Sequence, residues 1–254
     1  MNSSAIHHIA SGKRERAANI RSVKPLLAEL HAHTTWSDGD LSLSALVDLY
    51  GMHGFDVLCV TDHTVRSDEG IRFVGAHNWS VYLEDLDAEA ERAERLYGLL
   101  VLPGLELTAD HADPLRGAHA VAIGLRTFVS VNLGIRIAVR EARRAGAAII
   151  AAHPHAPGEN SRGTCRWWHE RDDPVIRPDR YELFNRRDCF TWVAERDLPC
   201  VATGDFHRDE HLRTWKTLLP CERGERSVVA FLRSDERAYL MPFSGRPVVE
   251  RAAA

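Results

Sequence analysis

Metal-binding side chains recur along this sequence at short, regular spacings. The segment His31-Ala32-His33 places two imidazoles two residues apart, and on an extended backbone such side chains point to the same side. Both rings can therefore reach one metal ion. Asp38 and Gly39 follow, and the glycine allows the chain to bend back. Imidazole and carboxylate groups suit Zn²⁺, Mn²⁺ and Fe²⁺, so the segment predicts a metal site.

Residues of the same types stand at the ends of apolar runs further along the chain. They are His63, Glu106, His153, Asp205 and His207. A further histidine, His119, stands near the start of the run 118–125. In barrels of parallel strands, functional residues gather at the carboxyl ends of the strands, so this placement predicts that they meet at one site. Asp62 precedes His63 and either orients a neighbouring ligand or caps a helix.

The complete ligand set is too large for one ion. It comprises His31, His33, Asp38, His63, Glu106, His119, His153, Asp205 and His207. Nine donors exceed the coordination number of a single four- to six-coordinate ion, so we expect two or three divalent ions, Zn, Mn or Fe. The set contains no thiolate, which argues against a structural zinc knot.

Apolar runs alternate with helical patterns in the elements that must position these residues. We predict strands over 25–30, 57–60, 99–102, 118–125, 147–152, 179–184, 200–203 and 238–241. We predict helices over 45–53, 78–97, 133–145, 190–196 and 227–232. Strands that are apolar throughout and alternate with helices are typical of a parallel sheet covered by helices, here in about seven units. The polar segment 162–177 is expected to be a loop or lid.

Composition limits the class of protein. The chain has 254 residues, 44% of them hydrophobic and 27% charged, which is typical of a soluble globular protein. This length favours one barrel-sized domain over 25–243, with a flexible lead-in over 1–24 and a tail over 244–254. The net charge of −4 argues against stable binding of long nucleic acid, but not against a small phosphorylated substrate. Sequence leaves the oligomeric state open.

Targeting signals are not evident in the sequence. No apolar run approaches the ~20 residues that a membrane helix needs, and the first 24 residues lack the apolar segment of a secretory signal. The five cysteines form no CxxC pair, which fits a reducing compartment. We therefore expect a cytoplasmic protein without a membrane partner.

The motifs HxHxxxSDG, TDH, PGLE, an isolated His, AHP and GDxH occur here in that order. Together they resemble the polymerase-and-histidinol-phosphatase (PHP) family of metallophosphoesterases, over roughly Leu27 to His211. The resemblance implies an α/β fold, a distorted (β/α)7 TIM-like barrel, with a bi- or trinuclear metal centre at the carboxyl ends of its strands. Glu29 stands where the family often has Asp, and we expect little effect from this change.

The resemblance also implies how the ligands divide among the ions. One ion would be held by His31, His33, Glu106 and Asp205. A second would be held by Glu106, as a bridging ligand, with His119 and His153. A third would be held by Asp38, His63 and His207. Some family members have His in place of Asp38, so the occupancy of the third site stays open.

A cluster of divalent ions suits attack on phosphorus. The ions lower the pKa of a bridging water towards neutrality, which gives hydroxide, and they stabilise the charge that builds up on the phosphoryl oxygens. The expected reaction is hydrolysis of a phosphomonoester or a small phosphodiester, such as a nucleotide or a short oligonucleotide end. Glu106, Asp205 and His207 are the candidate catalytic residues, and Asp205 or His207 could assist the leaving oxygen.

Residues near the expected barrel mouth are candidates for substrate contact. They are His155, Glu182, Arg186, Arg187 and Arg208. An arginine can clamp a phosphate group, although a solvated surface position is the alternative for each. We expect Glu182 to face the pocket rather than to bind metal. We expect no role in the site for His7, His8, His53, His77, His111, His169 and His211.

Two other function classes remain open. Amidohydrolase barrels share the HxH pair but usually need a bridging lysine, and Lys13, Lys24 and Lys216 lie away from the predicted strand ends. A non-catalytic, metal-stabilised binding module is the second alternative, although a scaffold does not need nine polar groups at one barrel mouth.

Overall fold

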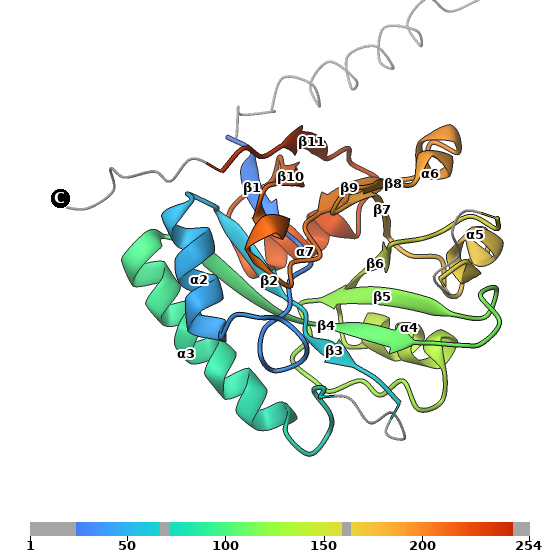
Figure 1. Cartoon of the computed structure of the whole chain (residues 1–254), viewed down its shortest axis with the longest axis horizontal. Coiled ribbons are helices and arrows are strands. Elements are labelled where there is room, and N and C mark those ends of the chain that lie inside the picture. The colour runs from blue at the N-terminus through green and yellow to red at the C-terminus, as the bar shows by residue number, and fades with distance from the viewer. Residues whose placement is uncertain (1–23, 67–71, 159–163, 246–254) are drawn as a thin grey trace, which may run out of the picture.

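A single curled sheet organises the structure, a computed structural model that describes residues 24–66, 72–158 and 164–245 (Figure 1). Its strands are β1 (Leu26–Glu29), β2 (Val57–Val60), β3 (His63–Thr64), β4 (Leu100–Ala109), β5 (Ala118–Ile123), β6 (Ala148–Ala152), β7 (Arg180–Asn185), β8 (Asp188–Cys189), β9 (Cys200–Thr203), β10 (Trp215–Leu219) and β11 (Tyr239–Pro242). The helices are α2 (Leu43–Met52), α3 (Trp79–Tyr97), α4 (Ile135–Arg144), α5 (Arg166–Glu170), α6 (Thr191–Glu195) and α7 (Glu225–Leu232), with a 3₁₀ turn η1 (Asp209–Leu212). Most of the predicted lead-in and tail lie outside the described residues.

Local sequence signals set many of the element boundaries. β2 and β9 have the predicted bounds. Helix α2 begins where the Ser42 hydroxyl accepts a hydrogen bond from the Ala45 amide at 3.3 Å. Helix α3 ends at Gly98, which adopts the left-handed conformation that favours glycine. Segment 162–177 is not only a loop, because α5 lies within it.

The expectation of a wholly parallel sheet is wrong. The order is β11-β10-β1-β2-β4-β5-β6-β7-β8, and β9 pairs with β7. Strand β5 runs antiparallel to both β4 and β6, and β10 runs antiparallel to both β1 and β11. The β4–β5 connection has no room for the crossover that parallel neighbours require. Strand β10 was not predicted, since Lys216 and Thr217 interrupt its apolar pattern.

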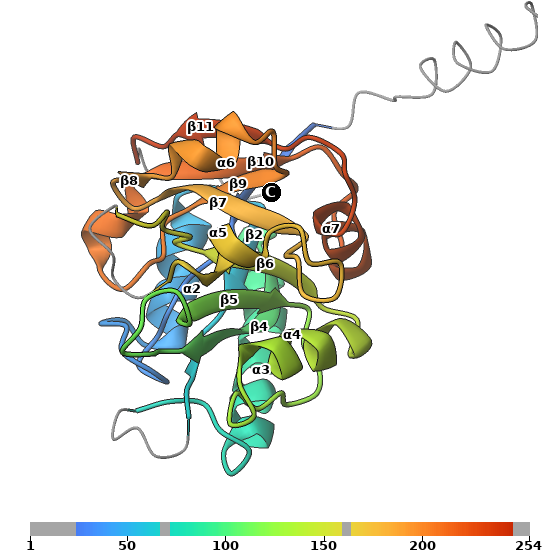
Figure 2. The same ribbon diagram turned by 90° about the vertical axis from the view of Figure 1, so that its right-hand side faces the viewer.

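The sheet curls into a half-barrel, with β4, β5, β6, β7 and β10 stacked in one view (Figure 2). Strands β1 and β9 are not ladder partners, yet their carboxyl ends meet through a parallel bridge between Ala32 and Phe206. The His33 amide donates to the Phe206 carbonyl at 2.8 Å, and the Phe206 amide donates to the His31 carbonyl at 3.0 Å. This curled α/β arrangement agrees with a TIM-like barrel, whereas the count of seven units and the single domain stay predictions.

Strand β4 is longer than its sequence pattern indicates. The predicted strand covers 99–102 and ends before Pro103, which cannot donate to a sheet ladder. Pro103 is, however, the last β4 residue that pairs with β2. Beyond it the strand pairs with β3 and β5, so that Glu106 stands opposite His63 on one side and Val121 on the other.

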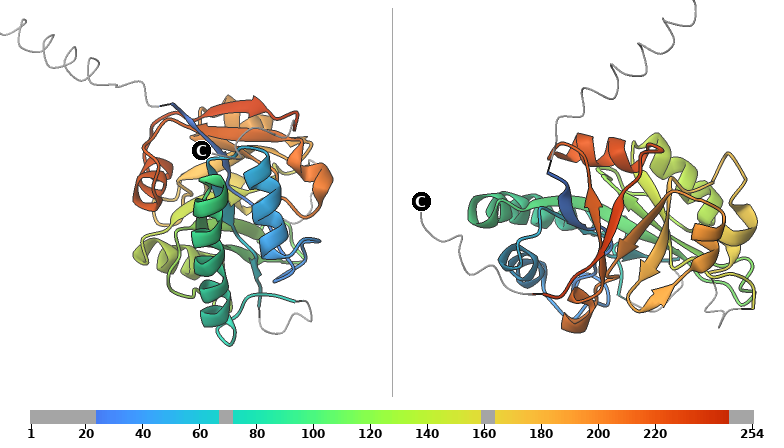
Figure 3. Two further views of the ribbon diagram at one scale, coloured as in Figure 1. Left: turned by 90° about the vertical axis from the view of Figure 1, so that its left-hand side faces the viewer. Right: turned by 90° about the horizontal axis from the view of Figure 1, so that it is seen from above.

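Helices cover the outside of the sheet, and α7 lies at one end of it. Helices α2 and α3 pack side by side, with α3 against β4 (Figure 3). Val228, Phe231 and Leu232 of α7 join the buried cluster formed by the inner faces of the strands. Arg180, at the start of β7, donates to the carbonyls of Phe231 and Leu232 at 2.8 and 3.1 Å. Helix α7 therefore covers the amino end of β7, away from the carboxyl ends of the strands.

The buried core predicts a steep stability cost for truncation at Leu58, which is fully buried in β2. Leu58→Ala should lower the free energy of unfolding by about 2–5 kcal/mol, because a cavity remains after the side chain is removed. Leu133 is 74% exposed, so Leu133→Ala should change the free energy of unfolding by less than about 0.5 kcal/mol. Urea unfolding followed by fluorescence measures both. Equal effects of the two substitutions would contradict this packing.

Candidate metal centre

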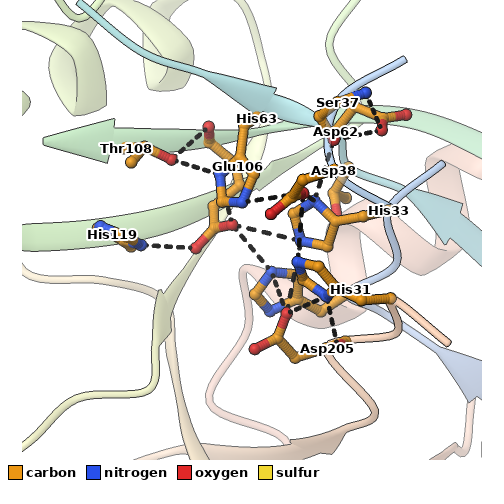
Figure 4. A network of polar contacts seen from close by, with 12 residues as sticks. His31, His33, Ser37, Asp38, Asp62, His63, Glu106, Thr108, His119 and Asp205 are labelled. Atoms are coloured by element: carbon orange, nitrogen blue, oxygen red, sulfur yellow. Dashed lines mark hydrogen bonds and ion pairs between the residues drawn. The ribbon is translucent and has the colours of Figure 1, made fainter. Parts of the chain in front are cut away.

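All nine predicted ligand residues meet at the carboxyl-end edge of the half-barrel. Figure 4 shows how the side chains of His31, His33, Asp38, His63, Glu106, His119 and Asp205 lie there. Strands β1, β6 and β9 run into this edge and are followed by His31, His153 and Asp205, respectively. Strand β5 runs the opposite way, so His119 reaches the same edge from near the start of its strand. The antiparallel direction of β5 therefore explains why this ligand precedes its apolar run.

The first group, site A, comprises His31, His33, Glu106 and Asp205. The Nε2 atoms of both histidines lie 3.3 Å from Glu106 Oε2. They lie 3.6 and 3.5 Å, respectively, from Asp205 Oδ1. His31 Nε2, His33 Nε2 and Glu106 Oε2 are buried and have no hydrogen-bond partner among the described residues. Buried polar atoms are almost always paired, so three unpaired ones pointing at one another mark a position for a cation.

The second group, site B, shares the carboxylate of Glu106. Its other oxygen, Oε1, lies 3.0 Å from His119 Nδ1 and 3.2 Å from His153 Nε2. One carboxylate thus faces site A with one oxygen and site B with the other. This is the arrangement expected of a ligand that bridges two ions.

The third group, site C, comprises His33, Asp38, His63 and His207. Asp38 Oδ1 lies 3.5 Å from His63 Nε2 and 3.3 Å from His207 Nε2. Asp38 is more exposed than the other carboxylates, with 55% of its side chain accessible. Site C is therefore the most open of the three.

The donor atoms fit divalent ions of the imidazole- and carboxylate-binding kind. Metal–ligand bonds of about 2.0–2.2 Å in a tetrahedron place neighbouring donors about 3.3–3.6 Å apart. The donor separations in site A match that range. Each group holds only nitrogen and oxygen donors, which suits Zn²⁺, Mn²⁺ or Fe²⁺.

Glu182 orients the ring of His31. Its Oε1 lies 2.8 Å from His31 Nδ1 and accepts from the Thr203 hydroxyl at 2.7 Å. Its Oε2 accepts from the His153 amide and the Asn185 side chain, both at 2.6 Å. With Nδ1 donating to this carboxylate, the lone pair of His31 Nε2 points into site A. The expectation that Glu182 faces the substrate pocket is wrong, because it is fully buried and both oxygens are engaged.

Asp62 organises the loop that follows the HxH segment. Its carboxylate accepts from the amide and hydroxyl of Thr34, each at 2.8 Å. It also accepts from the Ser37 hydroxyl at 2.6 Å and from Tyr82 at 3.2 Å. Asp62 contacts no imidazole and caps no helix. It instead fixes the turn that presents Asp38 to site C.

Partners further from the ligand atoms hold the remaining rings and their backbone. His63 Nδ1 lies 2.7 Å from the Thr108 hydroxyl, and His119 Nε2 lies 2.9 Å from Asp110 Oδ1. The indole of Trp167 donates to the His119 carbonyl at 2.6 Å, and both Trp167 and Trp192 are buried as expected. Sequence analysis did not single out Thr108 or Asp110.

The backbone is strained where the ligands stand. Among the described residues, four that are not glycine have positive φ, and three of them lie here: His153 (29°), Asp205 (41°) and Arg186 (51°). Such conformations are unfavourable for residues with a side chain and persist only where surrounding contacts enforce them. Glu182 and Thr164 hold His153 through its amide and carbonyl, and Arg186 Nε donates to the Asp205 carbonyl at 3.0 Å.

The close approach of carboxylates and imidazoles shifts their pKa values in opposite directions. Burial alone would raise the pKa of Glu106, but the nearby rings, His63 first, hold it well below its usual range. Burial opposes the charged form of His33, yet Asp205 and Glu106 outweigh it and raise its pKa to about 9. In the same way Asp110 and Glu106 raise the pKa of His119 to about 10.

The structure separates the substrate-contact candidates. Arg186 is one-third exposed and lies beside the ligands, with Nη2 3.0 Å from Asp205 Oδ2 and 2.8 Å from His207 Nδ1. Arg187 is exposed in the β7–β8 turn, and Arg208 is 58% exposed next to Glu210. The ring of His155 packs edge-on against Phe190 with centroids 5.0 Å apart. Arg186 therefore contacts two of the candidate ligands, Asp205 and His207.

Two residues that the sequence sets apart from the site lie close to it. His211 is not remote from it, because its Nδ1 accepts from the His207 amide at 3.1 Å. Burial, with Arg186 and other charges nearby, lowers the pKa of His211 to about 4. Lys216 is in a strand, fully buried, and its Nζ lies 2.6 Å from Glu29 Oε2. Lys216 nevertheless contacts no candidate ligand side chain, so it is not a bridging lysine.

The shifted histidine pKa values predict how stability depends on pH in chelator-treated protein. Folded His33 and His119 bind protons up to about pH 9 and 10, whereas unfolded histidine releases them near pH 6.5. Their contribution to stability is therefore full below pH 6.5 and is lost as the pH rises to about 10. The midpoint of thermal unfolding in EDTA should fall over this interval. An unchanged or rising midpoint would contradict the ion pairs described.

Comparison with known proteins rests on structure alone. No family model and no curated protein matches the sequence. A two-domain protein from Bacteroides vulgatus, described as containing a predicted PHP-like metal-dependent phosphoesterase, matches 88% of this chain and 66% of its own length, at 22% identity and a TM-score of 0.65. This chain thus spans slightly less than two thirds of that protein.

Two further solved structures are similar at lower levels. A protein from Bifidobacterium adolescentis, named as a metal-dependent phosphoesterase, matches 72% of this chain and 88% of its own, at 17% identity and a TM-score of 0.47. An amidohydrolase from Chromobacterium violaceum, with bound SO4 and no metal, matches 71% of this chain and 87% of its own, at 14% identity and a TM-score of 0.50. The Bacteroides protein has the highest TM-score of the three and matches most of this chain. The similarity shows that this chain has the fold of a PHP-like protein.

Proposed function

We propose that this protein is a metal-dependent phosphoesterase that hydrolyses a phosphomonoester or a small phosphodiester at sites A, B and C. The observation that carries the proposal is the meeting of three buried ligand atoms, His31 Nε2, His33 Nε2 and Glu106 Oε2, none of which has a hydrogen-bond partner among the described residues. A structural core would leave no such atoms unpaired. The fold shared with a PHP-like protein supports the same conclusion.

Three groups of side chains would hold the ions. Site A would use His31, His33, Glu106 and Asp205; site B would use Glu106, His119 and His153. Site C would use Asp38, His63 and His207, and the fourth member of that group, His33, would serve site A through its Nε2 while its Nδ1 lies 3.8 Å from Asp38 Oδ1. Two or three divalent ions of zinc, manganese or iron fit these donors. When bound, such ions lower the pKa of a coordinated water and neutralise charge on phosphoryl oxygens.

The chain's own residues prepare the site for this chemistry. Glu182 fixes the ring of His31, and Asp62 fixes the turn before Asp38. Arg186 uses its Nε and Nη2 donors to hold Asp205 and His207. A guanidinium has two further N–H groups on its third nitrogen, which suit a phosphoryl oxygen. We assign Arg186 to substrate binding, and Asp205 or His207 to protonation of the leaving oxygen.

The expected substrate is small and phosphorylated, and a nucleotide is one candidate. The net charge of −4 disfavours long nucleic acid. The five cysteines form no disulfide with one another, in keeping with the proposed cytoplasmic location. No helix in the described segments is both long and apolar enough to cross a membrane. Amidohydrolase activity is the alternative, and a chromogenic amide assayed beside the phosphate esters tests it.

Removal of metal should abolish activity. Protein treated with a chelator and then desalted should hydrolyse p-nitrophenyl phosphate or bis-p-nitrophenyl phosphate at least ~100-fold more slowly, because no group remains to activate water. Added Mn²⁺ or Zn²⁺ should restore the rate. Metal content by mass spectrometry and the initial rate are the measurements. A full rate after complete removal of metal would overturn the proposal.

Replacement of the HxH pair should have the same effect. His31→Ala/His33→Ala removes two nitrogen donors of site A, and we expect kcat/KM to fall by at least ~10³-fold. His77 and His169 are exposed, so His77→Ala/His169→Ala is the matched control and should keep wild-type kcat/KM. A similar kcat/KM for the two double variants would contradict the assignment of site A.

Arg186 and Arg187 form a second matched pair. Arg186→Ala should lower kcat/KM by roughly 10- to 100-fold, since a charge-assisted hydrogen bond contributes about 1.5–3 kcal/mol. Arg187→Ala, one residue further on and exposed, should leave it within about twofold. Steady-state kinetics at fixed metal concentration separate the two. Equal losses would show that the charge of this turn matters, and not the position of Arg186.

A further inference from the structure

An ion pair lies fully buried beneath the candidate ligands. It joins Glu29 of β1 to Lys216 of β10, and both side chains are 0% exposed. Lys216 Nζ donates to Glu29 Oε2 at 2.6 Å, to the Thr214 hydroxyl at 2.9 Å and to the His211 carbonyl at 3.1 Å. All three N–H groups of the ammonium are therefore used. A buried charge pair of this kind is costly unless its hydrogen bonds are complete.

The other oxygen of Glu29 binds backbone from two strand ends. Oε1 accepts from the Gly204 amide at 2.8 Å and from the amides of Leu30 and His31 at 3.1 and 3.2 Å. Gly204 directly precedes Asp205, and His31 is the first ligand after β1. One carboxylate thus fixes the backbone of two site A ligands that lie 174 residues apart along the chain.

The Glu29–Lys216 pair leaves no room for a side chain at position 204. A Cβ atom on Gly204 would lie 2.5 Å from Glu29 Oε2 and 2.5 Å from Lys216 Nζ. Only glycine lets the β9 end approach the pair so closely. The need for Gly204 in the GDxH motif therefore has a physical cause, and it lies in Glu29 and Lys216 rather than in the metal ligands.

Ordinary sheet pairing does not position these two strand ends. Strands β1 and β9 share only the isolated bridge between Ala32 and Phe206. The Glu29–Lys216 pair lies just before that bridge. It also connects helix α2 to the strand ends, because the Tyr50 hydroxyl of α2 donates to Glu29 Oε2 at 3.0 Å. The pair connects η1 in the same way, because Lys216 donates to the carbonyl of His211. The ring of His211 in turn accepts a hydrogen bond from the His207 amide.

We propose that Glu29 and Lys216 are positioning residues that hold the ends of β1 and β9 at the separation site A needs to bind a metal ion. Glu29 acts through its acceptor oxygen on the amides of Gly204 and His31, and Lys216 fixes the carboxylate. The expectation that Glu in place of Asp at this position has little effect stays a prediction. This inference rests on the proposed metal sites.

The test compares two double variants that both remove the buried charges. Glu29→Gln/Lys216→Met keeps an acceptor oxygen for the Gly204 and His31 amides, whereas Glu29→Met/Lys216→Met has a similar size and no acceptor. Co²⁺ is the probe, and its binding is followed by its visible absorption bands during titration, independently of catalysis. We expect Co²⁺ affinity within about threefold of wild type for the Gln variant. For the Met variant we expect at least a tenfold loss and altered absorption bands.

A variant destabilised elsewhere controls for a general loss of structure. Arg180 is buried at the opposite end of β7, where it binds carbonyls at the end of α7. Arg180→Met should lower the midpoint of thermal unfolding and leave Co²⁺ affinity unchanged. If the Met double variant does not fold, Gly204→Ala replaces it, with Gly51→Ala as its control. A Gly51 Cβ would instead meet the Tyr97 ring at 2.4 Å in the contact between α2 and α3.

The outcomes separate this inference from the proposed function. Wild-type protein that binds no Co²⁺ would overturn both. Wild type that binds Co²⁺, with a folded Met double variant that binds it equally well and with the same spectrum, would overturn the positioning role alone. A tenfold loss of Co²⁺ affinity in Arg180→Met, when its unfolding midpoint matches that of the Met double variant, would also overturn the positioning role. Loss confined to the acceptor-free variant, or to Gly204→Ala in its place, supports it.

Discussion

Glu106 is a buried carboxylate that lies within 3.3 Å of five imidazole rings. The described protein groups do not fully satisfy this cluster, because three of its buried atoms have no hydrogen-bond partner among them. In the absence of a cation, shared protons must offset the charge, which is why the pKa of Glu106 falls while those of His33 and His119 rise. A divalent ion would take the place of these protons. The rest of the structure can be understood as what keeps this cluster together.

Three sets of contacts outside the cluster do this. Glu182 fixes His31 and the amide of His153, Asp62 fixes the turn that carries Asp38, and the Glu29–Lys216 pair joins the β1 and β9 ends. Each uses a buried carboxylate whose oxygens accept several hydrogen bonds. The strained backbone at His153, Asp205 and Arg186 indicates that these contacts enforce conformations the local sequence disfavours.

Buried and exposed residues of the candidate site lie at different positions in the half-barrel. The ligands lie at the ends of buried strands, and α7 covers the opposite end of the sheet. Arg186 and Asp38 lie at the open side, where a substrate can arrive. Arg186 and Asp38 are thus more exposed than the ligands at the strand ends, and Arg186 also contacts two of those ligands, Asp205 and His207.

The sequence by itself determined which side chains are the ligand candidates and most of the elements that carry them. HxH, TDH and GDxH combine donor types with spacings that a strand end imposes, and β2, β9 and α3 follow from local apolar patterns. Only the tertiary structure decided the antiparallel direction of β5, the existence of β10, and the roles of Glu182, Glu29 and Lys216. Glu182 meets His31 across 151 residues, and Lys216 meets Glu29 across 187. Contacts between residues so far apart leave no periodic pattern in the sequence, and a buried charge shows its role only when its partner is in place.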